Sequence, residues 1–142
     1  MYISTNFTIE EFTHSQEAVR SAISNDPPPD VVKRLYTTAY KLEEVRKLLG
    51  DKPILISSGY RCIDLNRLLG SKDTSQHVRG EAVDFIAPTF GTPREIVEKI
   101  KDSNIDYDQL ILEFGRWVHC SFSDRNRKQA LIIDQTGTRA FA

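Results

Sequence analysis

Residues 75–85 read SQHVRGEAVDF and join a polar turn to an apolar strand. His77 lies in the turn, with Gly80 close behind it, and Asp84 lies within the apolar run AVDFI. Burying an unpaired carboxylate in such a strand carries a large free-energy cost. Three kinds of partner remain open on spacing alone: a metal ion, an arginine, or a set of backbone N–H donors. Asp84 is therefore expected to face one of these three.

The segments before this stretch are mainly helical. Thr8 stands three residues before Glu11, the pattern of a capping box, so a short helix is expected from about Ile9. The prolines of NDPPPD interrupt it, and Pro29 suits the first turn of a long helix over residues 30–50. That helix carries an apolar stripe at three- and four-residue steps, formed by Val31, Leu35, Ala39, Leu42, Val45 and Leu49. PILISSGYR (53–61) then predicts a buried strand and CIDLNRLLG (62–70) a brief helix.

The segments after Ser75 predict most of a sheet. EAVDFIAP (81–88) is expected as a strand, and TPREIVEKIKDSN (92–104) as a helix capped by Thr92 with Pro93 at its first position. Residues 108–114, 116–122 and 128–135 supply three further strands. Helices first and strands later indicate an α+β domain with a small, mostly antiparallel sheet and helices packed on one side. At 142 residues the whole chain, 1–142, is expected to form a single domain.

Composition narrows the classes of partner. The 19 basic and 20 acidic residues nearly cancel, which gives no indication of a nucleic-acid partner. No apolar run approaches the ~20 residues of a membrane span, so no membrane insertion is expected. The start MYISTNFTIEEF lacks the zones of a signal peptide, which predicts a protein made in the cytoplasm. Cys62 and Cys120 are then expected as reduced packing residues, and a monomer is the default.

A second histidine lies downstream in a comparable setting. His119 stands in the short strand RWVHCSF, and Glu113 precedes it by six residues in LILEF. If residues 114–116 form a hairpin turn, which Gly115 favours, the two strands bring Glu113 and His119 face to face. Catalytic zinc takes three such protein ligands and keeps a fourth position for water. The pattern is thus consistent with a zinc site.

Taken together, SSGYR, SQHVRGEAVDF and LILEFGRWVHCSF resemble the zinc D-Ala-D-Ala carboxypeptidase family (peptidase family M15), which includes phage endolysins and shares its fold with hedgehog domains. The family motif is roughly S-x-H-x-x-G-x-A-x-D, followed downstream by W-x-H. The matching positions are Ser75, His77, Gly80, Ala82 and Asp84, and then Trp117 and His119. The resemblance covers nearly the whole chain.

The resemblance implies roles for individual residues. His77, Asp84 and His119 would bind Zn²⁺. Arg61 would bind and polarise the substrate carbonyl or carboxylate, and the pocket would be shaped by Tyr60, Ser75 and Trp117.

One position departs from the family pattern. Many members carry Asp or Glu three residues before the last histidine as the general base, and here that residue is Arg116. Glu113 is the nearby carboxylate, and its spacing from His119 is like that of the hedgehog zinc site, so Glu113 is expected to be the base. The alternative is that Glu113 is a paired surface residue and that the base lies elsewhere.

By resemblance, the function is that of a zinc-dependent peptidase acting on peptidoglycan stem peptides. It would be a D-Ala-D-Ala carboxypeptidase or an endolysin-type endopeptidase acting on the cell wall, reached by phage-type release. Two alternatives remain: a non-catalytic zinc module that binds cell-wall peptide or a protein partner, and a structural phage particle protein without zinc.

Overall fold

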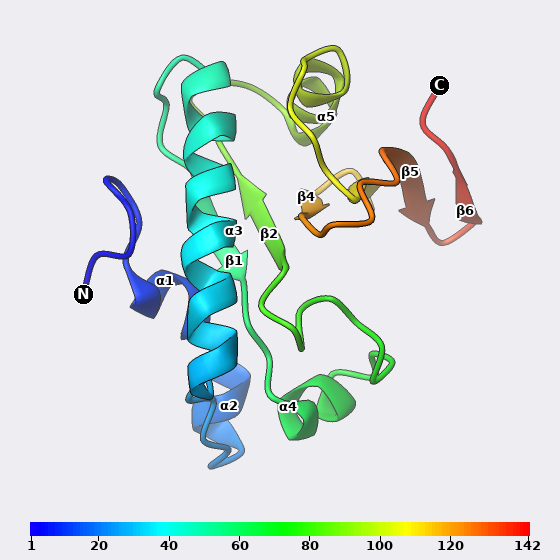
Figure 1. The fold of residues 1–142 in the computed structure, drawn as a ribbon. Coiled ribbons are helices and arrows are strands. Elements are labelled where there is room, and N and C mark those ends of the chain that lie inside the picture. Colours follow the sequence, from blue (N-terminus) through cyan, green and yellow to red (C-terminus); the bar gives the residue numbers. More distant parts are fainter.

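The computed structural model describes residues 1–142, whose strands form one mixed sheet. Figure 1 shows how the helices and strands are arranged. The helices are α1 (Ile9–Thr13), α2 (Gln16–Arg20), α3 (Pro29–Leu48), α4 (Ile63–Leu68) and α5 (Pro93–Lys101). The strands are β1 (Leu55–Ser58), β2 (Ala82–Ile86), β3 (Gln109–Glu113), β4 (Trp117–Ser121), β5 (Gln129–Asp134) and β6 (Gly137–Ala140). No helix has both the length and the apolar character needed to cross a membrane.

Local signals in the sequence set the helix ends. The predicted capping box of α1 forms between Thr8 and Glu11, and α5 has a second capping box between Thr92 and Glu95. Pro29 occupies the first turn of α3, as expected. This helix ends just before Gly50, whose φ of +74° lies in the left-handed region that glycine adopts without strain. The long helix and α5 therefore begin and end close to their predicted positions. The segment from Ile9 is a correction: it forms two short helices, α1 and α2, because Ser15 caps a new helix by accepting a hydrogen bond from the backbone N–H of Ala18.

The sheet corrects the expectation of a mostly antiparallel arrangement. Its strand order is β1-β2-β4-β3-β5-β6, and β3 pairs with β5 in parallel. The reason is topological: β2 already occupies one edge of β4 and β3 the other. The strand that follows β4 pairs with the free edge of β3 and reverses the direction of β4, so it runs parallel to β3. The sheet is consequently mixed.

Alternating side chains give the central strands two different faces. One face packs with α3 and α5 in the hydrophobic core and is formed by Val83, Phe85, Leu110, Leu112, Val118 and Cys120. The intervening positions point to the other face and carry Asp84 on β2, Glu113 on β3 and His119 on β4. The core face thus fixes the register that presents polar side chains on the opposite side.

The two edges of the sheet differ from the sequence-based expectations. Contrary to the expectation of a buried strand, Leu55 is 52% exposed, because it pairs with Ile86 on the face opposite the core, whereas Ile56 pairs with the core residue Phe85. At the far edge β6 was not predicted, and it pairs with β5 through a tight hairpin in which Asp134 lies opposite Gly137. Cys62 and Cys120 are free thiols, as expected, and Cys120 is fully buried in the core.

The apolar stripe of α3 gives a test of the packing. Leu35 is fully buried in the core, so Leu35→Ala should lower the free energy of unfolding by about 2–5 kcal/mol, from lost burial and the cavity left behind. Tyr40 lies on the same helix and is 67% exposed, so Tyr40→Ala should change the free energy of unfolding by less than about 0.5 kcal/mol. Urea denaturation measures both. Similar losses in the two variants would contradict the packing described.

Candidate metal centre

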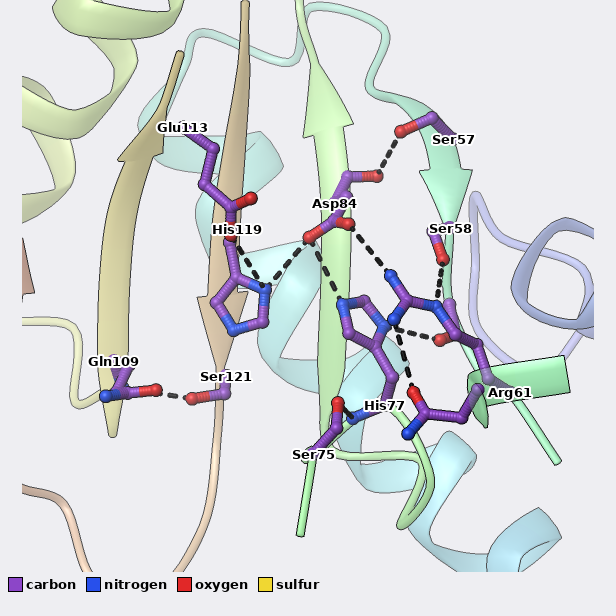
Figure 2. A network of polar contacts seen from close by, with 12 residues as sticks. Ser57, Ser58, Arg61, Ser75, His77, Asp84, Gln109, Glu113, His119 and Ser121 are labelled. Carbon is purple, nitrogen blue, oxygen red and sulfur yellow. Dashed lines mark hydrogen bonds and ion pairs between the residues drawn. The ribbon is translucent and has the colours of Figure 1, made fainter. Parts of the chain in front are cut away.

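Three buried side chains converge on the polar face of the sheet (Figure 2). One ligand atom each from His77, Asp84 and His119 lies within 4.8 Å of the other two. Asp84 Oδ1 is 3.3 Å from His77 Nε2 and 2.9 Å from His119 Nδ1. The three residues come from a turn and two strands, so the cluster exists only in the folded chain.

Strand register brings two of the three together. Asp84 on β2 and His119 on β4 are directly opposite in the antiparallel ladder, with their side chains on the same face. His77 comes from the turn that precedes β2, where Gly80 has a φ of +74°. A β-carbon at Gly80 would lie only 3.0 Å from a side-chain carbon of Val31 on α3. Glycine at this position therefore lets the turn fold back over the long helix and carry His77 to the sheet.

The position of the ring hydrogen of His77 indicates which of its nitrogens can bind a cation. Its Nδ1 is 2.7 Å from the carbonyl oxygen of Gly59, which can only accept, so Nδ1 carries the hydrogen. Burial lowers the pKa of His77, which favours the neutral ring. The Nε2 of a neutral ring is then a bare acceptor that faces the Asp84 carboxylate. A cation shared by His77 Nε2 and Asp84 Oδ1, either a proton or a metal ion, satisfies both atoms, and a metal ion bound by both is one such arrangement.

Asp84 supplies the negative charge of the centre. Burial alone would raise its pKa, but its contacts with His77 and His119 outweigh burial and hold the pKa well below the usual range. The carboxylate is therefore ionised at neutral pH. Nitrogen ligands from two imidazoles with one carboxylate are a donor set that zinc accepts, with a position left over. The residues present thus fit a divalent metal of the zinc type.

Glu113 lies beside this cluster on the neighbouring strand. Its Oε1 is 3.8 Å from His119 Nδ1. Burial and the charge of Asp84 raise the pKa of Glu113 above its ordinary value. The expectation that Glu113 and His119 pair face to face needs correction. Trp117 lies directly opposite Glu113, and His119 is the diagonal neighbour of Glu113. The 114–116 hairpin does form, with Phe114 and Gly115 both at positive φ.

Arg61 approaches Asp84 from the other side. Its Nη2 is 3.5 Å from Asp84 Oδ2, while Nε donates to Ser58 Oγ and Nη1 donates to Asn66 Oδ1. Its backbone N–H donates to the carbonyl of His77. The guanidinium is thereby fixed in direction, and Figure 2 shows it across Asp84 from Glu113. Asp84 therefore faces both a potential metal and an arginine, two of the three partners that the sequence left open.

The remaining candidate residues lie around the cluster. Ser75 lines the cleft beside it, and its hydroxyl accepts a hydrogen bond from the backbone N–H of His77. Tyr60 is buried in the hydrophobic core and also lines a hollow next to Arg61. Trp117 is half-buried beside Glu113, and its indole N–H has no hydrogen-bond partner. Their roles toward a substrate stay predictions.

Two asparagines hold the segment that carries Arg61, and the sequence patterns did not predict this role. The side chain of Asn66 is fully buried and joins Arg61 to the carbonyl of Lys72. Asn25 bonds the carbonyl of Tyr60 and the N–H of Cys62, so it clamps the segment that carries Arg61. At Gly59 a β-carbon would lie 2.4 Å from the carbonyl oxygen of Phe12. Only the SGYR pattern signalled this segment, because single asparagines give no sequence signal of such long-range bonds.

Comparison with known proteins agrees with this geometry. The family model described as Peptidase M15 matches residues 5–121, most of the chain. The chain belongs to the peptidase M15 family. The matched residues 5–121 of this chain include His77, Asp84 and His119.

A curated relative points the same way. The zinc D-Ala-D-Ala carboxypeptidase of Streptomyces albus G is 37% identical over 54 residues, which are 38% of this chain. The match spans about a fifth of that relative, 21% of its length. Family membership, the relative and the buried cluster together fit Zn²⁺ as the cofactor.

Zinc binding can be tested by removing one ligand. We expect the wild-type protein to retain about one zinc ion per chain after dialysis, and His77→Ala to lose most of it, because two remaining ligands hold zinc poorly. His14→Ala is the matched control, since His14 follows α1 and is absent from the cluster. Elemental analysis gives the zinc content and circular dichroism checks the fold. Full zinc content in folded His77→Ala would contradict the ligand assignment.

Proposed function

We propose that this chain is a zinc-dependent peptidase that hydrolyses a peptide bond in peptidoglycan stem peptides. The observation that carries the proposal is the placement of Glu113 and Arg61 on opposite sides of the buried Asp84. Membership of the M15 family supports the peptidase chemistry, and the name of the Streptomyces albus G relative supports the substrate class. Action on the cell wall, an endolysin-type role with phage-type release, and a monomeric state belong to the same proposal.

The proposed mechanism divides the work between these two side chains. Zinc bound by His77, Asp84 and His119 would supply Lewis acidity toward a carbonyl and acidify water. Glu113 Oε1, with a pKa raised by burial and by Asp84, is suited to accept a proton from the attacking water and to return it to the leaving nitrogen. Arg61 would hold the substrate oxygen on which negative charge develops.

Arg61 and Glu113 are both held in place by the fold, which favours a catalytic site over a site that only binds a peptide. Ser58 and Asn66 fix the guanidinium of Arg61, so little reorganisation is needed as charge develops. Glu113 lies at the end of β3, where the adjacent hairpin and the ladder to β4 fix its backbone. A rigid base next to a metal cluster supports the enzyme rather than the alternative, a non-catalytic zinc module for a cell-wall peptide or protein.

The base is tested by Glu113→Gln. This change keeps the shape of the side chain but removes its basicity, so kcat should fall by about 10²-fold or more with the zinc content unchanged. Glu98→Gln on the exposed face of α5 is the control and should keep full activity. Mass spectrometry of stem peptides incubated with zinc-loaded protein, with and without a chelator, measures turnover and identifies the bond cleaved.

The outcomes separate the two functions. Chelator-sensitive fragments that disappear in Glu113→Gln support the peptidase with this base. Intact peptides over several wall chemistries, from a protein with full zinc content, would overturn the peptidase and favour the binding module.

The role of Arg61 is tested by Arg61→Ala. Because its guanidinium contacts the second oxygen of Asp84 rather than a histidine, we expect turnover to fall about tenfold or more with a much smaller change in zinc affinity. Steady-state kinetics and zinc titration measure the two quantities. Equal losses in both would mean that Arg61 acts only by holding Asp84.

A further inference from the structure

A cleft extends from the metal cluster toward the far edge of the sheet. It has a volume of about 580 Å³ and is bordered at one end by Glu113 and His119. Its walls also include Lys72, Arg125 and Arg127. The two arginines contact Asp108, which precedes the first residue of β3, whereas Glu113 is the last residue of that strand, so these cations lie toward the other end. A separate hollow of about 450 Å³ lies on the other side of the cluster and is bordered by Tyr60 and Arg61. The metal cluster therefore lies between two hollows, of which the one beside Glu113 ends among cations.

A buried carboxylate organises this basic end. Asp108 is fully buried and accepts bonds from Arg127 Nε and Nη2, at 2.7 and 2.9 Å, and an ion pair of 3.2 Å from Arg125 Nη2. Gln76 donates to the same carboxylate. The Nε and Nη2 donors of Arg127 are therefore both bonded to Asp108, whereas Arg125 contacts Asp108 through Nη2 alone. The other donors of Arg125, which is about half exposed, stay free for a ligand.

The charges at this end do not cancel. Three cations line it, and the acid bonded to two of them is Asp108, which leaves an excess of two positive charges. The acids next to them in the sequence lie elsewhere: Asp73 is paired with Arg67, and Asp124 lines a different hollow. Lys72 has no ion-pair partner within 4 Å, whereas Lys128 pairs with Asp106. An anion entering the cleft would therefore meet Lys72 and Arg125.

The proposed function decides which part of a substrate reaches this end. If Glu113 returns a proton to the leaving nitrogen, the leaving portion of the peptide lies on the Glu113 side of the cluster. The cleft on that side is within the roughly 300–1,000 Å³ of pockets that hold small organic ligands. It therefore offers room for more than the atoms next to the scissile bond.

We infer that the cleft is a leaving-group subsite in which Lys72 and Arg125 bind a substrate carboxylate. This inference rests on the proposed function, since the assignment of the leaving side follows from Glu113. The carboxylate has two possible sources: the free C-terminus of the leaving portion, or the side chain of an acidic residue within it. Charge-assisted bonds from a lysine and an arginine select a carboxylate over its neutral amide.

The test compares matched substrates and a paired variant. Two peptides differ from a cleaved stem peptide in one group each: one has a C-terminal amide, and the other has a carboxamide on the acidic side chain of the leaving portion. In the wild-type protein, the amide that replaces the bound carboxylate should lower kcat/KM by about tenfold or more. The affected peptide identifies the source of the carboxylate.

The variant Lys72→Gln/Arg125→Gln should lose this discrimination. Its kcat/KM for the acid peptide should fall to that for the amide, while its value for the amide and its zinc content stay unchanged. Arg116→Gln is the control, because Arg116 is an exposed cation of the neighbouring hairpin that does not line the cleft. It should keep the wild-type preference. Equal kcat/KM for all three peptides in the wild type, or retained discrimination in the double variant, would overturn the inference.

Calorimetric binding of the same peptides to zinc-loaded protein keeps the subsite testable if no bond is cleaved. Suppose that the acid peptide binds more tightly than the amide peptide and that this difference is lost only in the double variant. This result would support the subsite, and only the peptidase proposal would then have failed. Equal affinity of the acid and amide peptides would overturn the subsite itself.

Discussion

The structure depends on one buried negative charge. Asp84 lies in a central strand whose neighbouring residues form the core, and its carboxylate would be unstable there without cations around it. His77, His119 and Arg61 reach it from a turn, a strand and a loop far apart in the sequence. Satisfying this charge therefore fixes the positions of the groups that give the site its chemistry.

The sheet separates stability from function by its two faces. The face toward α3 and α5 is apolar and fixes the register of the strands. The opposite face receives Asp84, Glu113 and His119 at alternate positions, so their spacing is set by backbone hydrogen bonds. This division explains how a small domain can hold a base and a metal cluster rigidly. It also leaves the polar face open along its length, where the basic cleft continues toward β5 and β6.

Much of the site could be predicted from the sequence because its residues stand in recognisable local patterns. The apolar run around Asp84 and the turn before it indicated a charge needing a partner, and the zinc ligand set followed from the resemblance to the family. Asn25 and Asn66 could not be found in this way. Their amides bond backbone and side-chain groups of other segments, and a lone asparagine has no periodicity or spacing that identifies such a partner. The basic cleft likewise needed the fold to bring Lys72 and Arg125 into the lining of one cleft.

Local sequence signals predicted α3, α4, α5 and most strands, because caps, prolines and apolar periods act over a few residues, but they did not predict the break between α1 and α2. Tertiary structure decided the order of the strands, the parallel pairing of β3 with β5, and the exposure of Leu55 on the face opposite the core. It also decided that Glu113 meets His119 along a diagonal rather than directly across the hairpin. The physical reason is that local signals fix the conformation of a segment, whereas neighbours and register depend on which edges remain free and which faces must be buried.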